Sequence, residues 1–286
     1  MKKLVITMIF TMLLIASTIS ARALFEKNDN NSVSFLDGVP TWNVGDSWTY
    51  VVNDFTVHYQ QGGQMIYFTG KIDDFTLTVA EVGQNTYTVD FTGKLDCGYA
   101  IYLSTSNGLN VYLIGNMKPA TTRMQGSIVF TKSNLQIRDI TGDIRGITMA
   151  QIDPLPFAIP IPFRASIDGD LSTDFPLFNF PLSSNKFWEM PSMSIQMKMN
   201  IGGFFGFIQI PVTFITQYGW TPLAFHCRNK QSVTVQAGTF QAWEIQSTFF
   251  DLFRYYYAPS VGNIVKVDAS LSNGEVSAEL ISTNVV

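Results

Sequence analysis

The chain has 286 residues, a formal net charge of −4, and only 14% charged residues against 14% aromatic ones. A charged fraction of about 25% is usual, so uncharged polar residues must cover much of the surface. No long run of basic residues occurs, so the sequence does not indicate the phosphate neutralisation that nucleic-acid binding requires. We expect a chain with a sizeable core and no nucleic-acid partner.

Residues 1–23 predict a signal peptide. Lys2-Lys3 precedes an apolar stretch over residues 4–16, and Ala21-Arg22-Ala23 gives a small-x-small pattern for cleavage after Ala23. An uncleaved anchor is the alternative, although the apolar stretch is shorter than the roughly 20 residues that span a bilayer. We expect an exported protein, extracellular or in the cell envelope, whose mature chain begins with a polar leader at residues 24–38.

The chain contains two cysteines, Cys97 and Cys227. Paired thiols in an oxidising compartment tend to form a disulfide, so we expect a bridge between them. Two buried free thiols are the alternative.

Alternation of apolar and polar residues recurs after the leader and predicts β-strands. Gly83-Gln84-Asn85, Ser106-Asn107-Gly108 and Asn273-Gly274 each separate two such runs, which predicts three hairpins. No segment after the signal keeps a helical apolar period over several turns. The predicted fold is all-β: one domain over residues 39–286, an antiparallel meander forming a curved half barrel or sandwich.

Two segments break the hairpin pattern. The first is a proline-rich insertion at about residues 150–182, where six of the twelve prolines lie. Proline lacks the N–H that donates in a strand ladder, so we expect an extended edge or a covering flap, not a central strand. The second segment, residues 201–211, is apolar on both faces of a strand. It must be covered on both faces, or it contacts a ligand, a partner or a membrane.

Residues suited to catalysis or metal binding are few. His58 and His226 have no paired ligand spacing, and with two cysteines expected in a bridge they do not form a zinc set. Gly45-Asp46-Ser47 lacks the second glycine of a nucleophile elbow, so we interpret Asp46-Ser47 as a turn entering a strand. Asp168-Gly169-Asp170 does not match a calcium loop. We expect no metal, no cofactor and no enzymatic activity.

Three segments together resemble a known family. They are residues 40–50 (PTWNVGDSWTY), 233–243 (VTVQAGTFQAW) and 255–266 (YYYAPSVGNIVK), with a looser match at Phe180-Pro181-Leu182 and Trp188. They resemble exported prokaryotic β domains sometimes labelled TapB-like, whose fold is grouped with the LolA/LolB-like lipoprotein carriers. The resemblance implies a half barrel whose concave side accepts an acyl chain. Helices cover the barrel in those carriers, whereas here only the proline-rich segment is available as a lid.

These observations favour a non-enzymatic domain that binds an apolar ligand or partner, such as a lipid or an envelope protein, on the concave face of a curved sheet. Membrane contact is compatible with the sequence, which predicts no transmembrane segment after the signal. The alternatives are a structural or adhesive envelope domain with a filled core and, more weakly, an unrecognised hydrolase. The residues expected to line the ligand site are Phe157, Ile161, Phe163, Phe204, Phe205, Phe207 and Ile210.

Overall fold

The computed structural model describes residues 38–61, 64–104, 110–152, 157–189, 193–201, 207–214, 217–218, 221–222, 224–248, 253–271 and 274–285. The regular elements of this part of the chain are all β-strands. The predicted signal peptide lies outside the described residues, as do residues 24–37 of the polar leader and both Phe204 and Phe205.

The strands are unusually long in the first half of the chain, where β2 to β4 have 19 to 22 residues against a usual length of about 5–6. The strands are β1 (Ser47–Gln61), β2 (Gln64–Val82), β3 (Thr86–Ser104), β4 (Asn110–Thr131), β5 (Ile137–Ile152), β6 (Ala158–Phe175), β7 (Lys186–Glu189), β8 (Met193–Ile201), β9 (Phe207–Phe214), β10 (Gln217–Tyr218), β11 (Thr221–Pro222), β12 (Ala224–Val235), β13 (Gly238–Ser247), β14 (Phe253–Ala258), β15 (Asn263–Leu271) and β16 (Gly274–Thr283).

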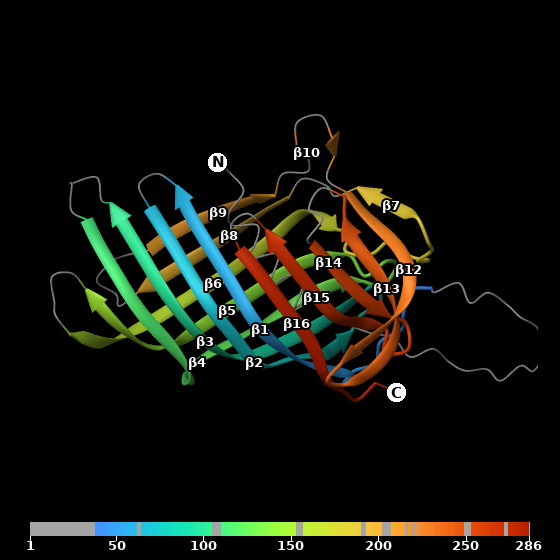
Figure 1. Cartoon of the computed structure of the whole chain (residues 1–286), viewed down its shortest axis with the longest axis horizontal. Helices are drawn as coiled ribbons and strands as arrows, with labels where there is room; N and C mark the ends of the chain where they lie inside the picture. Colours follow the sequence, from blue (N-terminus) through green and yellow to red (C-terminus); the bar gives the residue numbers. More distant parts are fainter. Residues whose placement is uncertain are drawn as a thin grey trace, which may run out of the picture.

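Fourteen of these strands form one antiparallel sheet in the order β7-β12-β13-β14-β15-β16-β1-β2-β3-β4-β5-β6-β8-β9. Most neighbours in the sheet are also neighbours in the chain, as in a meander, and β16 pairs with β1. Strands β10 and β11 form a separate pair. Within the described residues the edge strands β7 and β9 do not pair, so the sheet curves without closing (Figure 1). The predicted all-β antiparallel meander is confirmed.

All three predicted hairpins are present. The last pairs of their ladders are Val82 with Tyr87, Ser104 with Asn110, and Leu271 with Gly274. In the first hairpin the Gly83 N–H donates to the carbonyl oxygen of Thr86 at 2.9 Å and closes the turn. In the first hairpin local turn chemistry therefore sets the strand pair, as the sequence predicts.

The turn predicted at Asp46-Ser47 is also confirmed. Gly45 has a φ of +92°, which a residue with a side chain adopts only with strain, and β1 begins at Ser47. The Gly45 N–H donates to the Val79 carbonyl, and the Val79 N–H donates to the Asp46 carbonyl, both at 2.9 Å. Two backbone bonds thus fix the turn against β2 and direct Trp48, which is fully buried, into the core.

The long strands bend near their middle and turn one sheet into two facing layers. Pairing shifts between Asp73 and Thr76 on β2, between Lys94 and Cys97 on β3, and between Met117 and Thr122 on β4. Such bulges bend a strand and increase its twist. Figure 1 shows the result: β14 to β16 and one half of each of the bent strands β2 to β4 lie in front, and β5, β6, β8 and β9 lie behind them. The core fills the space between these layers.

The connection between β6 and β7 fills part of the interior next to β14. Leu177, Phe178, Phe180 and Leu182 are all buried there. The Tyr255 hydroxyl donates to the Leu177 carbonyl at 2.6 Å. This bond and the contacts of the Phe178 ring with Tyr255 and Tyr257 attach the connection to β14, so Phe180-Pro181-Leu182 belongs to a packing element.

The flap predicted for the proline-rich insertion is wrong. Residues 158–170 pair along β5, and residues 163–168 also pair with β8, so this part of the segment is a strand within the sheet. Alternate residues of a strand direct their N–H groups to opposite neighbours, so Pro160 and Pro162 face the same side. Ile159 and Ile161 can then bond to β5 while the prolines face the other side, where no described residue pairs with residues 158–162. The other alternative, an extended edge, describes residues 158–162.

The predicted disulfide is wrong. Cys97 and Cys227 are both free and buried. Cys97 is held in β3 between Gly70 and Met117, and Cys227 is held in β12 between Lys186 and Ile245. Because each cysteine is fixed inside its own strand ladder, the sheet holds the two thiols at separate positions. The alternative of two buried free thiols is the one that the structure contains.

Candidate functional site

The side chains expected on the concave face belong to the core where the structure describes them. Ile161 and Phe163 are only 7% and 4% exposed, and the Phe163 ring stacks on Tyr99 at 6.4 Å. Phe157 is instead 57% exposed. Phe207 and Ile210 lie on β9, but their side chains are outside the description. The predicted residues therefore do not gather in one cavity among those described.

Tyr99 on β3 joins the two layers through its contacts with Phe163 on β6 and Thr148 on β5. Its hydroxyl oxygen lies 3.2 Å from the oxygen of the buried Thr148 hydroxyl, whose single hydrogen is donated to the Asn116 carbonyl at 2.7 Å. Burial raises the pKa of Tyr99, since the phenolate would lose its hydration. Gly115 is required beside this ring, because an added Cβ would lie 2.3 Å from the Tyr99 hydroxyl oxygen. This part of the concave face is packed, not open.

One end of the sheet carries the tips that join β1 to β2, β3 to β4 and β5 to β6, and we call it the hairpin end. The outer face there has an unusual composition. We call it the apolar belt, and it comprises the outward residues of β2 to β6 nearest the hairpin tips: Met65, Tyr67, Thr69, Gly98, Ala100, Tyr102, Ile114, Asn116, Ile147, Met149, Ala158, Pro160 and Pro162. None of these residues carries a charge. Ile147 and Met149 are 55% and 46% exposed, and Phe157 adds a further exposed ring beside Ala158.

Strand register places belt residues of neighbouring strands opposite one another, with apolar pairs on β2 to β4 and on β5 and β6 and with the uncharged Asn116 opposite Met149 between them. Ala100 pairs with both Tyr67 and Ile114 on its two sides. Met149 lies opposite Pro160, and Ile147 lies opposite Pro162. Scattered exposed apolar residues are normal on a soluble protein, whereas contiguous ones mark interaction surfaces. The belt is therefore a candidate docking surface in the described part of the chain.

A row of basic residues lies beyond the apolar belt, directly next to it on β5 and β6 and separated from it on β3 and β4 by the ion pair of Asp96 with Lys118. Lys94, Arg123, Arg145 and Arg164 lie directly opposite one another on β3 to β6. We call these four residues the basic row. They are 19 to 29 positions apart in the sequence, so no basic run exists, and only the register aligns them. Like charges directly opposite one another destabilise a sheet, so packing does not explain this alignment.

The acidic residues near the basic row only partly balance it. Lys94 Nζ lies 2.6 Å from Asp74 Oδ2, and Arg164 Nε lies 2.8 Å from Asp143 Oδ1. Arg145 Nε contacts the other oxygen of the same Asp143 carboxylate. The Arg123 side chain makes no hydrogen bond or ion pair with the described residues. The row thus has four cations against two carboxylates, with one guanidinium unoccupied.

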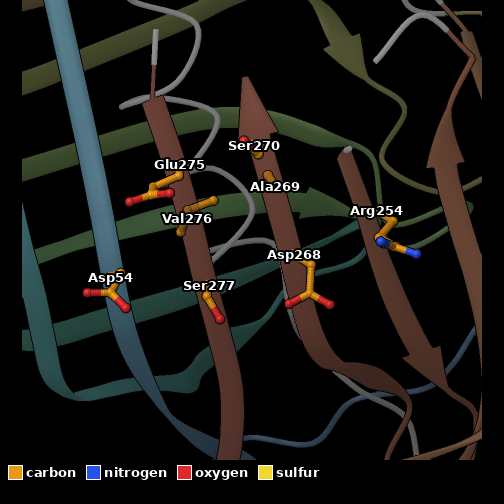
Figure 2. A pocket seen from close by; sticks show the side chains of 8 residues that line it. All are labelled: Asp54, Arg254, Asp268, Ala269, Ser270, Glu275, Val276 and Ser277. Carbon is orange, nitrogen blue, oxygen red and sulfur yellow. The ribbon is translucent and has the colours of Figure 1, made fainter. Parts of the chain in front are cut away.

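A separate polar depression of about 270 Å³ lies on the outer face of β1 and β14 to β16 (Figure 2). Asp54, Ser277, Asp268 and Arg254 form one cross-strand row along it. Glu275 adds a third carboxylate at its rim in Figure 2. In the described part of the chain, no group of three or more His, Cys, Asp or Glu side chains is arranged to hold a metal ion.

The same row separates its serine from His226. It continues from Arg254 through Gln246 to His226 on β12, four strand steps from Ser277. At about 4.8 Å per step this is about 19 Å along the sheet, too far for proton transfer. His226 stacks on Phe187 at 4.1 Å, and burial is the largest cause that lowers its pKa. Its environment is that of a packed side chain.

The buried thiols give a direct test of the disulfide correction. Burial raises the pKa of Cys97 to about 12, so its reactive thiolate is scarce at neutral pH. We expect no reaction of the native protein with a thiol reagent, and two thiols per chain after denaturation without reductant. No free thiol after denaturation would contradict the structure. The folded pKa of Cys97 exceeds the unfolded value of 9.0, so the fold favours the neutral thiol over the thiolate. The stability that depends on the neutral Cys97 thiol is therefore complete below pH 9 and declines as the pH rises toward 12.

The comparisons with known proteins add no relative. No protein-family model matches the chain, no curated protein matches it, and no solved structure matches it. The TapB-like resemblance therefore stays an expectation from three sequence segments. In the described residues, no helix has the length and apolar character needed to cross a membrane.

Proposed function

We propose that this protein is a non-enzymatic docking domain that binds an apolar partner on the outer face of its sheet, at the hairpin end. The observation that carries the proposal is the continuous, uncharged apolar belt with exposed Ile147 and Met149. A ligand site on the concave face is less well supported, because Ile161 and Phe163, which were expected to line it, are buried in the core. The N-terminal sequence supports docking outside the cytoplasm.

The alternative is a structural or adhesive envelope domain with a filled core. The stacked Tyr99 and Phe163 rings favour a filled interior at that point. A purely structural domain does not need a continuous exposed apolar surface, since such surfaces promote aggregation. The belt therefore favours docking over a structural role alone.

The test is the double variant Ile147→Gln/Met149→Gln. Both side chains are exposed, so the fold should be retained, while each apolar side chain contributes about 1.5–3 kcal/mol when fully buried in a complex. We expect the retention factor of the full chain on phenyl-substituted agarose to fall about tenfold or more. Unchanged retention would refute docking through the belt.

A matched control is Val44→Gln. Val44 is an exposed aliphatic residue in the turn before β1, at the opposite end of β1 from the tip that joins β1 to β2. We expect its substitution to leave retention nearly unchanged. Equal losses of retention in the control and in the double variant would indicate nonspecific hydrophobic adsorption and not binding through a defined surface.

A further inference from the structure

We propose that the partner of the apolar belt is a lipid bilayer surface with anionic headgroups, and that the basic row contacts their phosphates. This inference rests on the proposed function and names its partner. It starts from the separation of apolar and basic residues on the outer face. Toward the hairpin tips the belt has no charged residue, and beyond it the four cations of the basic row cross four adjacent strands.

The spacing of the two zones fits the edge of a bilayer. Ile147 follows Arg145 by two residues, and both point to the outer face, so they lie about 7 Å apart along β5. Interfacial proteins bury their apolar side by about 5–10 Å at the boundary between headgroups and acyl chains. An apolar side chain below that boundary therefore leaves the neighbouring guanidinium at the level of the phosphates.

The aromatic residues of the apolar belt support the same placement. Tyr67 and Tyr102 lie on the belt at β2 and β3, and Tyr67 is exposed. Tyrosine is enriched where protein meets the membrane interface, because its ring is apolar and its hydroxyl remains hydrated. An interface with another protein that excludes water would require a specific hydrogen-bond partner for each of these hydroxyl groups.

Charge distinguishes a lipid surface from a second copy of this chain. The nearby carboxylates Asp74, Asp96 and Asp143 are already paired with Lys94, Lys118 and two arginines. A second copy presents the same occupied carboxylates and the same excess cations, so it adds little counter-charge. Phosphate groups supply the missing negative charge to the unoccupied Arg123, and its guanidinium can bind phosphate through two parallel hydrogen bonds.

The experiment measures binding of the full chain to vesicles of phosphatidylcholine alone and of phosphatidylcholine mixed with phosphatidylglycerol. We expect clear preference for the mixed vesicles, weakened when salt rises from about 0.1 M to about 1 M and the Debye length falls from about 10 Å to about 3 Å. A cation near an anionic surface contributes about fivefold in binding. Arg123→Gln should thus lose about fivefold, and Arg123→Gln/Arg145→Gln/Arg164→Gln about 100-fold.

Arg138→Gln is the matched control, since Arg138 is exposed at the other end of β5. We expect it to bind mixed vesicles as the native chain does. Equal binding to both vesicle types, or an unchanged Arg123→Gln variant, would overturn the inference. So would self-association through the belt without vesicle binding, or a preference for duplex DNA over mixed vesicles.

Retention on phenyl-substituted agarose separates the two proposals. If the Ile147→Gln/Met149→Gln variant loses retention but the native chain does not prefer anionic vesicles, docking stands and the lipid assignment fails. If that variant keeps full retention, the proposed function itself fails.

Discussion

Replacing Phe225 with alanine should lower the free energy of unfolding by about 3–5 kcal/mol. Phe225 lies on β12, is fully buried, and has ring contacts on several sides. Its ring centroid lies 5.6 Å from Trp188, 5.7 Å from Tyr255, 6.1 Å from Phe253 and 6.4 Å from Phe175. These rings come from β6, β7 and β14, so truncation opens a cavity that no single side chain can fill.

Urea unfolding followed by tryptophan fluorescence and circular dichroism measures this loss. Phe187→Ala is the control, because Phe187 lies on β7 next to Trp188 but is exposed and stacks only on His226 among the described rings. We expect it to cost no more than about 1.5 kcal/mol. Similar losses in both variants would mean that the interior around Phe225 is not tightly packed.

The hairpins could be predicted because they depend on adjacent residues. Gly83-Gln84-Asn85 and Asn273-Gly274 set a turn, and the flanking alternation then aligns the two strands. The turn at Gly45-Asp46 is likewise local. The same information does not reveal that β16 pairs with β1, because that pairing joins residues more than 200 positions apart.

The positions of the prolines and cysteines depend on which strands pair and on which side. Pro160 and Pro162 are compatible with a strand because β5 needs only one side of β6. Cysteine count and compartment predict a disulfide only when the fold brings two thiols together, and here separate ladders hold Cys97 and Cys227. Composition alone cannot supply that geometry.

The apolar belt corresponds to a visible pattern in the sequence, which is a long absence of charged residues. Residues 55–70 and 97–117 contain no Asp, Glu, Lys or Arg, and they supply outward positions of β2 to β4 near the hairpin tips. A charge-free strand with two apolar faces indicates that the outward face is also covered or docked. The basic row left no such signal, because bulges in β3 and β4 determine which cations become neighbours.

Ile161→Ala/Phe163→Ala should leave the chain largely unfolded. Burial implies costs of about 2–5 kcal/mol for the isoleucine and about 3–5 kcal/mol for the phenylalanine. Their sum of about 5–10 kcal/mol approaches the usual total stability of about 5–15 kcal/mol. Phe163 also joins the two layers through its stack on Tyr99, so its loss weakens the contact between β6 and β3.

Thermal melting by circular dichroism distinguishes this outcome from a ligand-binding role for the same residues. Phe157→Ala serves as the control, because that ring is mostly exposed and should contribute within about 0.5 kcal/mol. If Ile161 and Phe163 served mainly to contact a ligand, the double variant would keep a cooperative melt and lose only uptake of a fluorescent fatty acid. A cooperative melt near the native temperature would therefore contradict the core assignment and revive the concave site. Loss of the melt in the double variant, with a native melt for Phe157→Ala, would place both side chains in the structural core and leave the outer face as the surface available for docking.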